Sequence, residues 1–177
     1  MKTILSTLLM VTGLTAYANE CNFNNIQSTS PVEKFLDNND GTVTDLRFGL
    51  TWTKCTFGQE YNVSDKTCVG EGKALNTWSD AIDSQTDINQ QSFAGYDDWR
   101  LPNIKELQSI VERACKNPAI RPEVFPDSIN APYWSNTPDG TVNDGALGRV
   151  VDFVDGTEFL KATNVNLYVR HVRSIND

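Results

Sequence analysis

The segment from Gly95 to Leu107 constrains the fold more tightly than any other part of this chain. Asn103 precedes Glu106 by three positions and an apolar helical pattern follows, so the two side chains can form a reciprocal capping box. Pro102 cannot continue a helix on its upstream side, and it favours an extended residue before it. The sequence therefore predicts that a helix begins at Ile104 and that the chain arrives there as a strand or loop.

Apolar residues recur at intervals of three and four in two stretches, which predicts two amphipathic helices. The first helix begins at Thr77 and is predicted to be short. The second begins at Ile104, carries Leu107 and Val111 on its apolar stripe, and is predicted to end near residues 116–118. Both stripes must face a core.

Short apolar segments separated by tight turns predict strands in the rest of the chain. The pairs Asp40-Gly41 and Asp155-Gly156 supply the positive φ that hairpin turns need. Segment 117–147 is rich in Pro, Asn, Asp and Gly, and it is predicted to be a long structured loop around Tyr133–Ser135. The predicted strands are residues 35–36, 42–44, 50–53, 149–154, 157–160 and 167–172. We therefore predict an α+β fold, with two helices packed on short antiparallel strands.

The chain carries four cysteines, and an even number in an exported protein favours disulfides over thiol chemistry. Cys55 and Cys68 flank the polar stretch 56–67, and a bond between them would close a short loop worth about 3 kcal/mol in the chain-entropy model. Cys21 and Cys115 then remain for the second disulfide. A structural zinc site would favour a Cys-x-x-Cys pair, which the sequence lacks.

Residues 1–18 have the pattern of a cleaved secretion signal. Lys2 supplies the positive start, Ile4–Leu14 the apolar run and Ala16–Ala18 the small residues before cleavage. We predict an N-terminal extension over residues 19–33, in which residues 19–31 are the only plausible linker, and a single domain over residues 34–177. The protein is expected to be exported, to the periplasm, the cell surface or the medium. No later apolar run approaches the roughly 20 residues of a spanning helix, so a membrane-embedded protein is not expected.

The formal net charge of −8 argues against nucleic acid and anionic membrane surfaces as partners, because both would repel the chain. His171 is the sole histidine, and it lies in a predicted strand without a nucleophile motif nearby. No phosphate-cradling glycine loop or metalloprotease motif occurs either. The sequence therefore predicts a protein that is not an enzyme.

The best candidate for a ligand site lies in the predicted loop, between Pro126 and Asp144. Loops of this length usually bind a ligand or close over one. Oxygen donors here suit sugar hydroxyls, and the neighbouring aromatic rings could form a platform. The candidate residues are Tyr133, Trp134, Asn136, Asp139 and Asp144. No metal or cofactor is predicted, and calcium on these oxygen donors is the alternative.

A series of motifs resembles the Lcl C-terminal domain family. The matching segments run in order along most of the chain: Asp40–Asp45, Gly49–Trp52, Trp78 with Ala81, Gly95–Leu107, Phe125–Pro126, Tyr133–Ser135, Val151–Phe153, Asp155–Gly156, Tyr168–Arg170 and Val172–Arg173. The family is found in exported bacterial proteins and looks related to C-type-lectin-like folds, so the resemblance implies a fold of that kind. Many relatives have a cysteine at the position of His171.

The resemblance implies a function in binding rather than catalysis. The family's named member is an adhesin whose terminal domain binds sulfated glycosaminoglycans. For this chain we expect an exported, adhesin-like binding module for a glycan or surface component. The alternative is a periplasmic protein-interaction module, in envelope assembly or as an inhibitor. Binding of a sulfated ligand would require a basic face, for which the candidates are Arg149, Lys161, Arg170 and Arg173.

Overall fold

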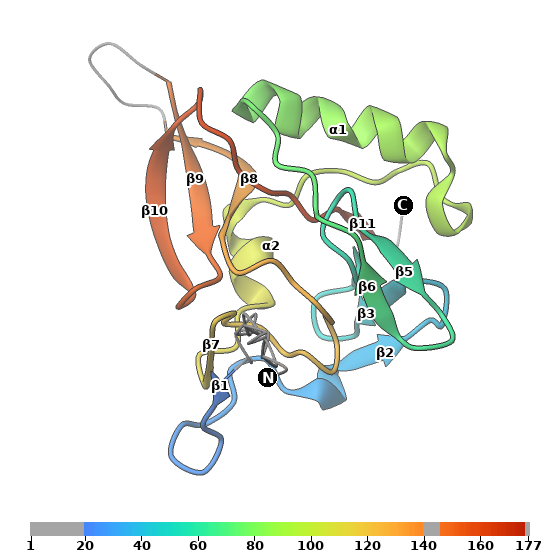
Figure 1. Ribbon diagram of the computed structural model, residues 1–177, viewed down its shortest axis with the longest axis vertical. Helices are drawn as coiled ribbons and strands as arrows, with labels where there is room; N and C mark the ends of the chain where they lie inside the picture. The colour runs from blue at the N-terminus through green and yellow to red at the C-terminus, as the bar shows by residue number, and fades with distance from the viewer. Residues whose placement is uncertain (1–19, 140–145, 176–177) are drawn as a thin grey trace, which may run out of the picture.

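A computed structural model describes residues 20–139 and 146–175 of the protein (Figure 1). The predicted signal peptide, residues 1–18, lies outside the described residues, as does the candidate ligand residue Asp144.

The predicted α+β class is confirmed, with two α-helices among antiparallel strands. The helices are α1 (Trp78–Gln90) and α2 (Ile104–Ser109), and the 3-10 turns are η1 (Val32–Lys34) and η2 (Phe93–Gly95). The strands are β1 (Glu20–Cys21), β2 (Phe35–Asp37), β3 (Thr42–Asp45), β4 (Leu50–Thr53), β5 (Glu60–Asn62), β6 (Thr67–Val69), β7 (Cys115–Lys116), β8 (Pro132–Asp139), β9 (Leu147–Asp152), β10 (Thr157–Ala162) and β11 (Val172–Ser174). None of the helices in the described ranges is long and apolar enough to cross a bilayer.

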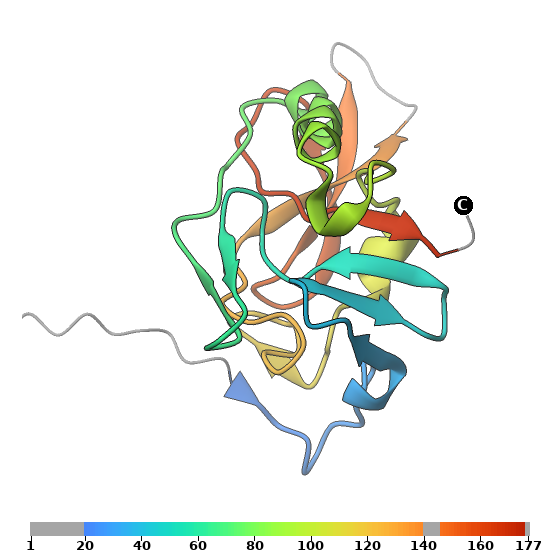
Figure 2. The same ribbon diagram turned by 90° about the vertical axis from the view of Figure 1, so that its right-hand side faces the viewer.

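Two larger sheets and two small ones form the fold. One larger sheet has the strand order β11-β4-β3-β2 and the other β10-β9-β8, while β1-β7 and β5-β6 are two-stranded ribbons. In Figure 1 the sheet of β8, β9 and β10 stands on one side of the molecule and the four-stranded sheet on the other. Figure 2, turned by 90°, shows α1 nearly end-on above the sheets.

Strand β9 separates the two clusters of the core. Consecutive side chains of a strand point to opposite faces of the sheet. Val150 accordingly packs in the cluster that holds Trp134, while Val151 packs in the cluster that holds Trp52 and Leu107. All five side chains are fully buried. The sheet of β8, β9 and β10 is therefore covered on both faces along this part of β9.

The capping box that the sequence predicts is confirmed, and it fixes the start of α2. The Asn103 side chain accepts from the Glu106 N–H at 3.0 Å, and a Glu106 carboxylate oxygen accepts from the Asn103 N–H at 2.7 Å. Arg100 adds two hydrogen bonds of 2.8 Å to the same carboxylate. Because the two capping contacts join residues three apart and Arg100 lies only six residues before Glu106, these contacts form for local reasons.

The predicted helix lengths are wrong. Helix α1 has 13 residues and is not short, whereas α2 has six and does not approach residues 116–118. Beyond α2 the apolar pattern continues into the core, but Val111 forms an antiparallel bridge with Ile120, and the Glu112 N–H bonds to the Ala119 carbonyl. Pairing with a distant segment therefore replaces the helix that periodicity alone favours.

Two predictions about the C-terminal half also need correction. The predicted loop contains an eight-residue strand, β8, which pairs with β9 across an irregularity between Trp134 and Pro138. The predicted strand 167–172 is regular only from Val172, because its backbone bonds successively to Leu75, Trp134, Phe57 and Thr53. The hairpin of β9 and β10 is confirmed, with Thr157 opposite Asp152.

Both predicted disulfides are confirmed, Cys21–Cys115 and Cys55–Cys68. They indicate an oxidising environment, as expected for an exported protein. The N-terminal extension is not a free linker, since β1 pairs with β7 and residues 28–30 bond to the buried carboxylate of Glu112.

Candidate functional site

A cleft of about 550 Å³ lies between the loop that follows β4 and helix α1. The loop forms one wall, α1 and η2 form the opposite wall, and His171 lies between them. Ligand sites are typically concave and combine apolar surface with a few polar groups, and this cleft has both. Its lining residues are Asp40, Thr53, Cys55, Thr56, Phe57, Gly58, Gln59, Glu60, Tyr61, Lys73, Asp87, Ile88, Gln91, Phe93 and His171.

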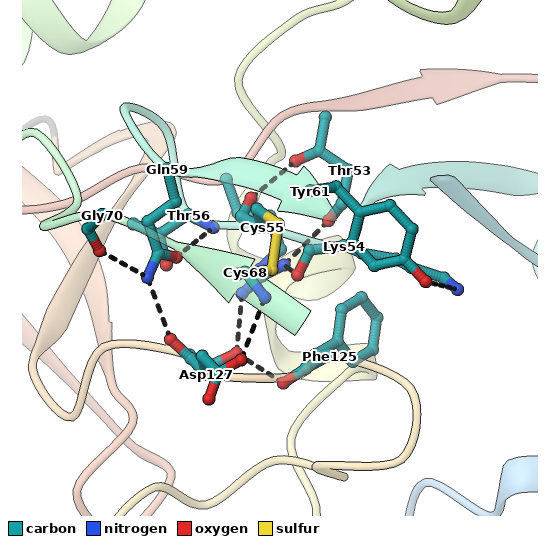
Figure 3. The surroundings of a disulfide bond; sticks show 12 residues. Thr53, Lys54, Cys55, Thr56, Gln59, Tyr61, Cys68, Gly70, Phe125 and Asp127 are labelled. Atoms are coloured by element: carbon teal, nitrogen blue, oxygen red, sulfur yellow. Dashed lines mark hydrogen bonds between the residues drawn. A yellow bond between two sulfur atoms is a disulfide. The ribbon is translucent and has the colours of Figure 1, made fainter. Parts of the chain in front are cut away.

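The Cys55–Cys68 disulfide holds the loop wall in place, as Figure 3 shows. Within the loop, the Gln59 side chain accepts from the Thr56 N–H at 3.0 Å and donates to the Asp127 carbonyl at 3.2 Å. The Asp127 carboxylate in turn accepts from the Cys68 N–H at 2.9 Å. These contacts fix a segment that is otherwise poor in regular structure, and so they position the wall.

Replacing Cys55 and Cys68 by serine is expected to lower the free energy of unfolding by about 3 kcal/mol, because the unfolded chain gains the freedom of the opened loop. Urea-induced unfolding measures this change. The control is Ser64→Ala in the same loop, an exposed position expected to change stability by less than about 0.5 kcal/mol. A double variant as stable as its parent would show that the loop needs no covalent closure.

The floor of the cleft is a buried, neutral histidine. Ser84 donates to the Ala81 carbonyl at 2.7 Å and lies 2.9 Å from Nε2 of His171. Because a carbonyl can only accept, the serine proton is used there, and Nε2 must carry the proton that it donates to Ser84. Nδ1 is then an acceptor with no hydrogen-bond partner among the described residues. Burial lowers the pKa of His171 to about 4, so the ring is neutral at ordinary pH.

The Ser84–His171 pair does not have the geometry of an activated nucleophile. The serine is buried and its proton is held by a backbone carbonyl. Across residues 20–139 and 146–175, no carboxylate bonds to the imidazole, so the base lacks the third group that orients it in catalytic triads. The histidine is therefore better suited to accept a hydrogen bond from a ligand.

Three aromatic rings line the walls of the cleft. Nζ of Lys73 lies 5.6 Å from the centroid of the Phe57 ring, and Nζ of Lys54 lies 4.9 Å from that of Tyr61. Phe93 is held edge-on against the buried Trp99, with centroids 5.8 Å apart. The chain's own ammonium groups thus already lie over two of the rings, which is the cation–π geometry.

The charged lining of the cleft is mostly acidic. Three carboxylates, those of Asp40, Glu60 and Asp87, face one ammonium group, that of Lys73. The Asp40 carboxylate accepts from the backbone and hydroxyl of Thr42 and so also caps the hairpin turn. Within the described part of the chain, the carboxylates of Glu60 and Asp87 have no hydrogen-bond or ion-pair partner. The cleft therefore favours cationic or donor-rich ligands over anions.

The two aromatic rings expected to form a platform, those of Tyr133 and Trp134, lie in the core. Tyr133 and Trp134 are fully buried. The Tyr133 hydroxyl lies 2.5 Å from that of Thr56 and accepts from the Ile129 N–H at 3.1 Å. Burial raises the pKa of Tyr133, which keeps it protonated. Both rings therefore hold the sheets together rather than meeting solvent.

Of the polar candidates in the same segment, the two that the structure describes, Asn136 and Asp139, do not line the cleft. Asn136 is exposed on β8. Asp139 is half-buried and lies 3.2 Å from Arg149, which also bonds to Glu158 at 2.6 Å. Arg149 and Asp139 therefore neutralise one another in part.

The four basic candidates do not form an exposed basic face. Arg170 is buried and donates to the carbonyls of Thr53 and Lys54, with its guanidinium carbon 4.9 Å from the centroid of Phe125. Arg173 is also buried and bonds to Asp98 at 2.6 Å. The other two candidates, Arg149 and Lys161, are half-buried on the sheet of β8, β9 and β10. A polyanion would therefore meet little free positive charge at these residues.

The cleft is a site that sequence reasoning missed, because its residues come from five separate segments. Glu60 and Tyr61 fall in the disulfide-closed loop, and Asp87 lies on the solvent side of α1. The sequence features that could have indicated the cleft were the disulfide-closed loop and the single histidine. In the ranges that the structure describes, no group of three or more His, Cys, Asp or Glu side chains is placed to hold a metal ion.

The chain belongs to the Lcl C-terminal domain family, whose model matches residues 41–173. That range contains both larger sheets apart from β2 and the last residue of β11, and it contains all but one of the residues that line the cleft, Asp40 being the exception. The chain has no significant match among curated proteins or among solved structures.

Proposed function

We propose that this protein is an exported, non-enzymatic binding module, which recognises a glycan or another surface component in the cleft between the β4–β5 loop and α1. The observation that carries the proposal is the cleft itself, which combines aromatic walls, carboxylates and a neutral histidine in about 550 Å³. A relationship to C-type-lectin-like folds is part of the proposal. It rests on the arginine-leucine-proline step of Arg100–Pro102 into a helix.

The acidic lining of the cleft favours a neutral or basic ligand over a sulfated one. Asp40, Glu60 and Asp87 would repel a polyanion at short range, and the net charge of −8 would repel it at long range. The glycosaminoglycan binding of the family's adhesin is therefore not proposed for this chain.

A glycan array and an affinity pull-down, each with and without EDTA, test the proposal. Phe57→Ala is expected to weaken capture of the retained ligand by about tenfold or more, because it removes an aromatic wall. Asn136→Ala, at the site that the sequence favours, is the control and should leave capture unchanged. Loss of capture with Asn136→Ala alone would move the site to β8. Loss of capture in the presence of EDTA would show that ligand binding also requires a metal ion.

The second candidate is a protein-interaction module, and one apolar surface favours it. Leu46 and Phe48, in the turn between β3 and β4, are 60% and 52% exposed, and Ile175 lies beside the same turn at Gly49 with 45% exposure. Contiguous exposed apolar residues often mark protein contacts. Substituting aspartate for Leu46 and Phe48 should abolish capture of a protein partner and leave a cleft ligand bound.

A further inference from the structure

The cleft continues into a second cavity along α1. This cavity has a volume of about 280 Å³ and shares Lys73 and Asp87 with the cleft. The hydrogen-bonded pair of Ser84 and His171 joins their floors, since Ser84 lines the second cavity and His171 lines the first. The two cavities therefore adjoin along α1, and together they are called the groove.

One side of this groove carries a stripe of carboxylates. Asp80, Asp83 and Asp87 are spaced by three and four residues on α1, so they share a face of the helix over about 10 Å. Glu60 extends the acidic lining on the other wall. The structure gives these four carboxylates no hydrogen-bond or ion-pair partner anywhere in the part of the chain that it describes.

The floor provides an observation that is independent of the acidic stripe. His171 is 1% exposed, lines the cleft and has its Nε2 proton committed to Ser84, which leaves Nδ1 as an acceptor without a partner among the described residues. Because His171 lines the cleft, an acceptor of this kind can take a hydrogen bond from a ligand or water. The floor thus offers an acceptor for an N–H or O–H group in the same cleft as the rings of Phe57, Tyr61 and Phe93.

From these contacts we infer that the groove binds an extended organic polycation with primary ammonium groups. One ammonium group lies between the aromatic walls, donates to Nδ1 of His171 and is balanced by Glu60 and Asp87. A second cationic group lies along the stripe at Asp80 and Asp83. A free oligoamine and a lysine-rich peptide share this chemistry. The inference deepens the proposed function and rests on the same cleft.

Lys73 occupies part of the site in the free protein. Its ammonium group lies over the Phe57 ring, at the junction of the two cavities, where it competes with a ligand cation for the same ring and carboxylates. Removing this charge should therefore strengthen the binding of an amine. Such a gain is not expected from a residue that has only a structural role.

Calorimetric titration of the full domain at low salt tests the inference with spermidine, n-butylamine and an acetylated trilysine amide. Spermidine is expected to bind about tenfold more tightly than n-butylamine, because only spermidine reaches the stripe. Glu60→Gln with Asp87→Asn should weaken both amines about tenfold, whereas Asp80→Asn with Asp83→Asn should weaken spermidine alone. Lys73→Gln should tighten both by about threefold.

Two controls separate a site from general attraction between opposite charges. Glu33→Gln removes one exposed carboxylate on η1, and Lys105→Gln removes one exposed ammonium group on α2; neither residue lines either cavity. Neither should change amine affinity. Equal weakening by Glu33→Gln and by the groove variants would overturn the inference, and so would the absence of amine binding. Tighter binding of the trilysine amide than of spermidine would identify a peptide as the ligand, and the reverse order a free oligoamine.

Failure of the inference can be told apart from failure of the proposed function. If amines do not bind but Phe57→Ala still abolishes capture of a neutral glycan, the polycation inference is wrong and the cleft remains the site. If Phe57→Ala changes no captured ligand at all, the cleft is not the site and both proposals are wrong.

Discussion

Replacing Glu112 by glutamine is expected to lower the free energy of unfolding by about 3–5 kcal/mol, because it breaks a buried ion pair on one side only. The carboxylate is fully buried and lies 3.3 Å from Arg121. It also accepts hydrogen bonds from residues 28–30, including 2.5 Å from Ser28 and 3.1 Å from the Ser30 N–H, and from the Ala114 N–H at 2.9 Å. Glutamine would turn an amide N–H toward these donors, and urea-induced unfolding measures the loss.

Glu123→Gln is the matched control for this change. Glu123 lies 3.9 Å from the same arginine, but its side chain is 56% exposed. The same chemical substitution should therefore cost less than about 0.5 kcal/mol. Equal effects of the two substitutions would show that the N-terminal segment is not held by Glu112.

The cost of Glu112→Gln should also depend on pH. Burial alone would raise the pKa of Glu112, but hydrogen bonds from Ser28, Ala114, Thr29 and Ser30 together lower it below its ordinary value of 4.5. A carboxyl group whose pKa is lowered by folding stabilises the native state above its unfolded pKa, and this contribution is lost as the pH falls through the folded pKa. The stability difference between parent and variant should therefore be constant above about pH 5 and shrink below about pH 4.5.

Trp99→Ala is expected to cost about 3–5 kcal/mol, as truncation of a buried tryptophan leaves a large cavity. Trp99 is 1% exposed, and its indole N–H donates to the Phe93 carbonyl at 3.0 Å. The Asn89 side chain bonds to both its backbone N–H and its carbonyl. Because Trp99 supports Phe93 and the end of α1, the variant should also disorder the wall of the cleft that α1 and η2 form. Thermal unfolding and ligand capture measure the two effects.

Phe48→Ala is the control for this truncation, since Phe48 is 52% exposed and leaves no internal cavity. It is expected to cost less than about 1 kcal/mol. A Trp99→Ala protein that unfolds at the parent's temperature and loses only ligand binding would contradict the structural role assigned to this residue.

The sequence by itself determined the features that depend on residues close along the chain. The capping box of Asn103 and Glu106 forms within one turn, and the Asp-Gly pairs at residues 40–41 and 155–156 form hairpin turns because both glycines adopt a positive φ. The Cys55–Cys68 disulfide joins cysteines that lie close along the chain, and Cys21 and Cys115 then remain to form the second disulfide. Family membership likewise follows from the order of short motifs.

The tertiary structure alone decided the features that depend on distant partners. Helix α2 stops early because Val111 pairs with Ile120, and Glu112 binds an N-terminal segment more than 80 positions away. Arg170 has a charged side chain of a kind that usually lies at the surface, yet it is buried in the core, where backbone carbonyls and Ser128 accept most of its hydrogen bonds. Which polar side chains become buried depends on how the sheets pack, because a sequence pattern gives the spacing of residues along the chain but not their partners in space. For the same reason, only the assembled fold could join five segments into the cleft.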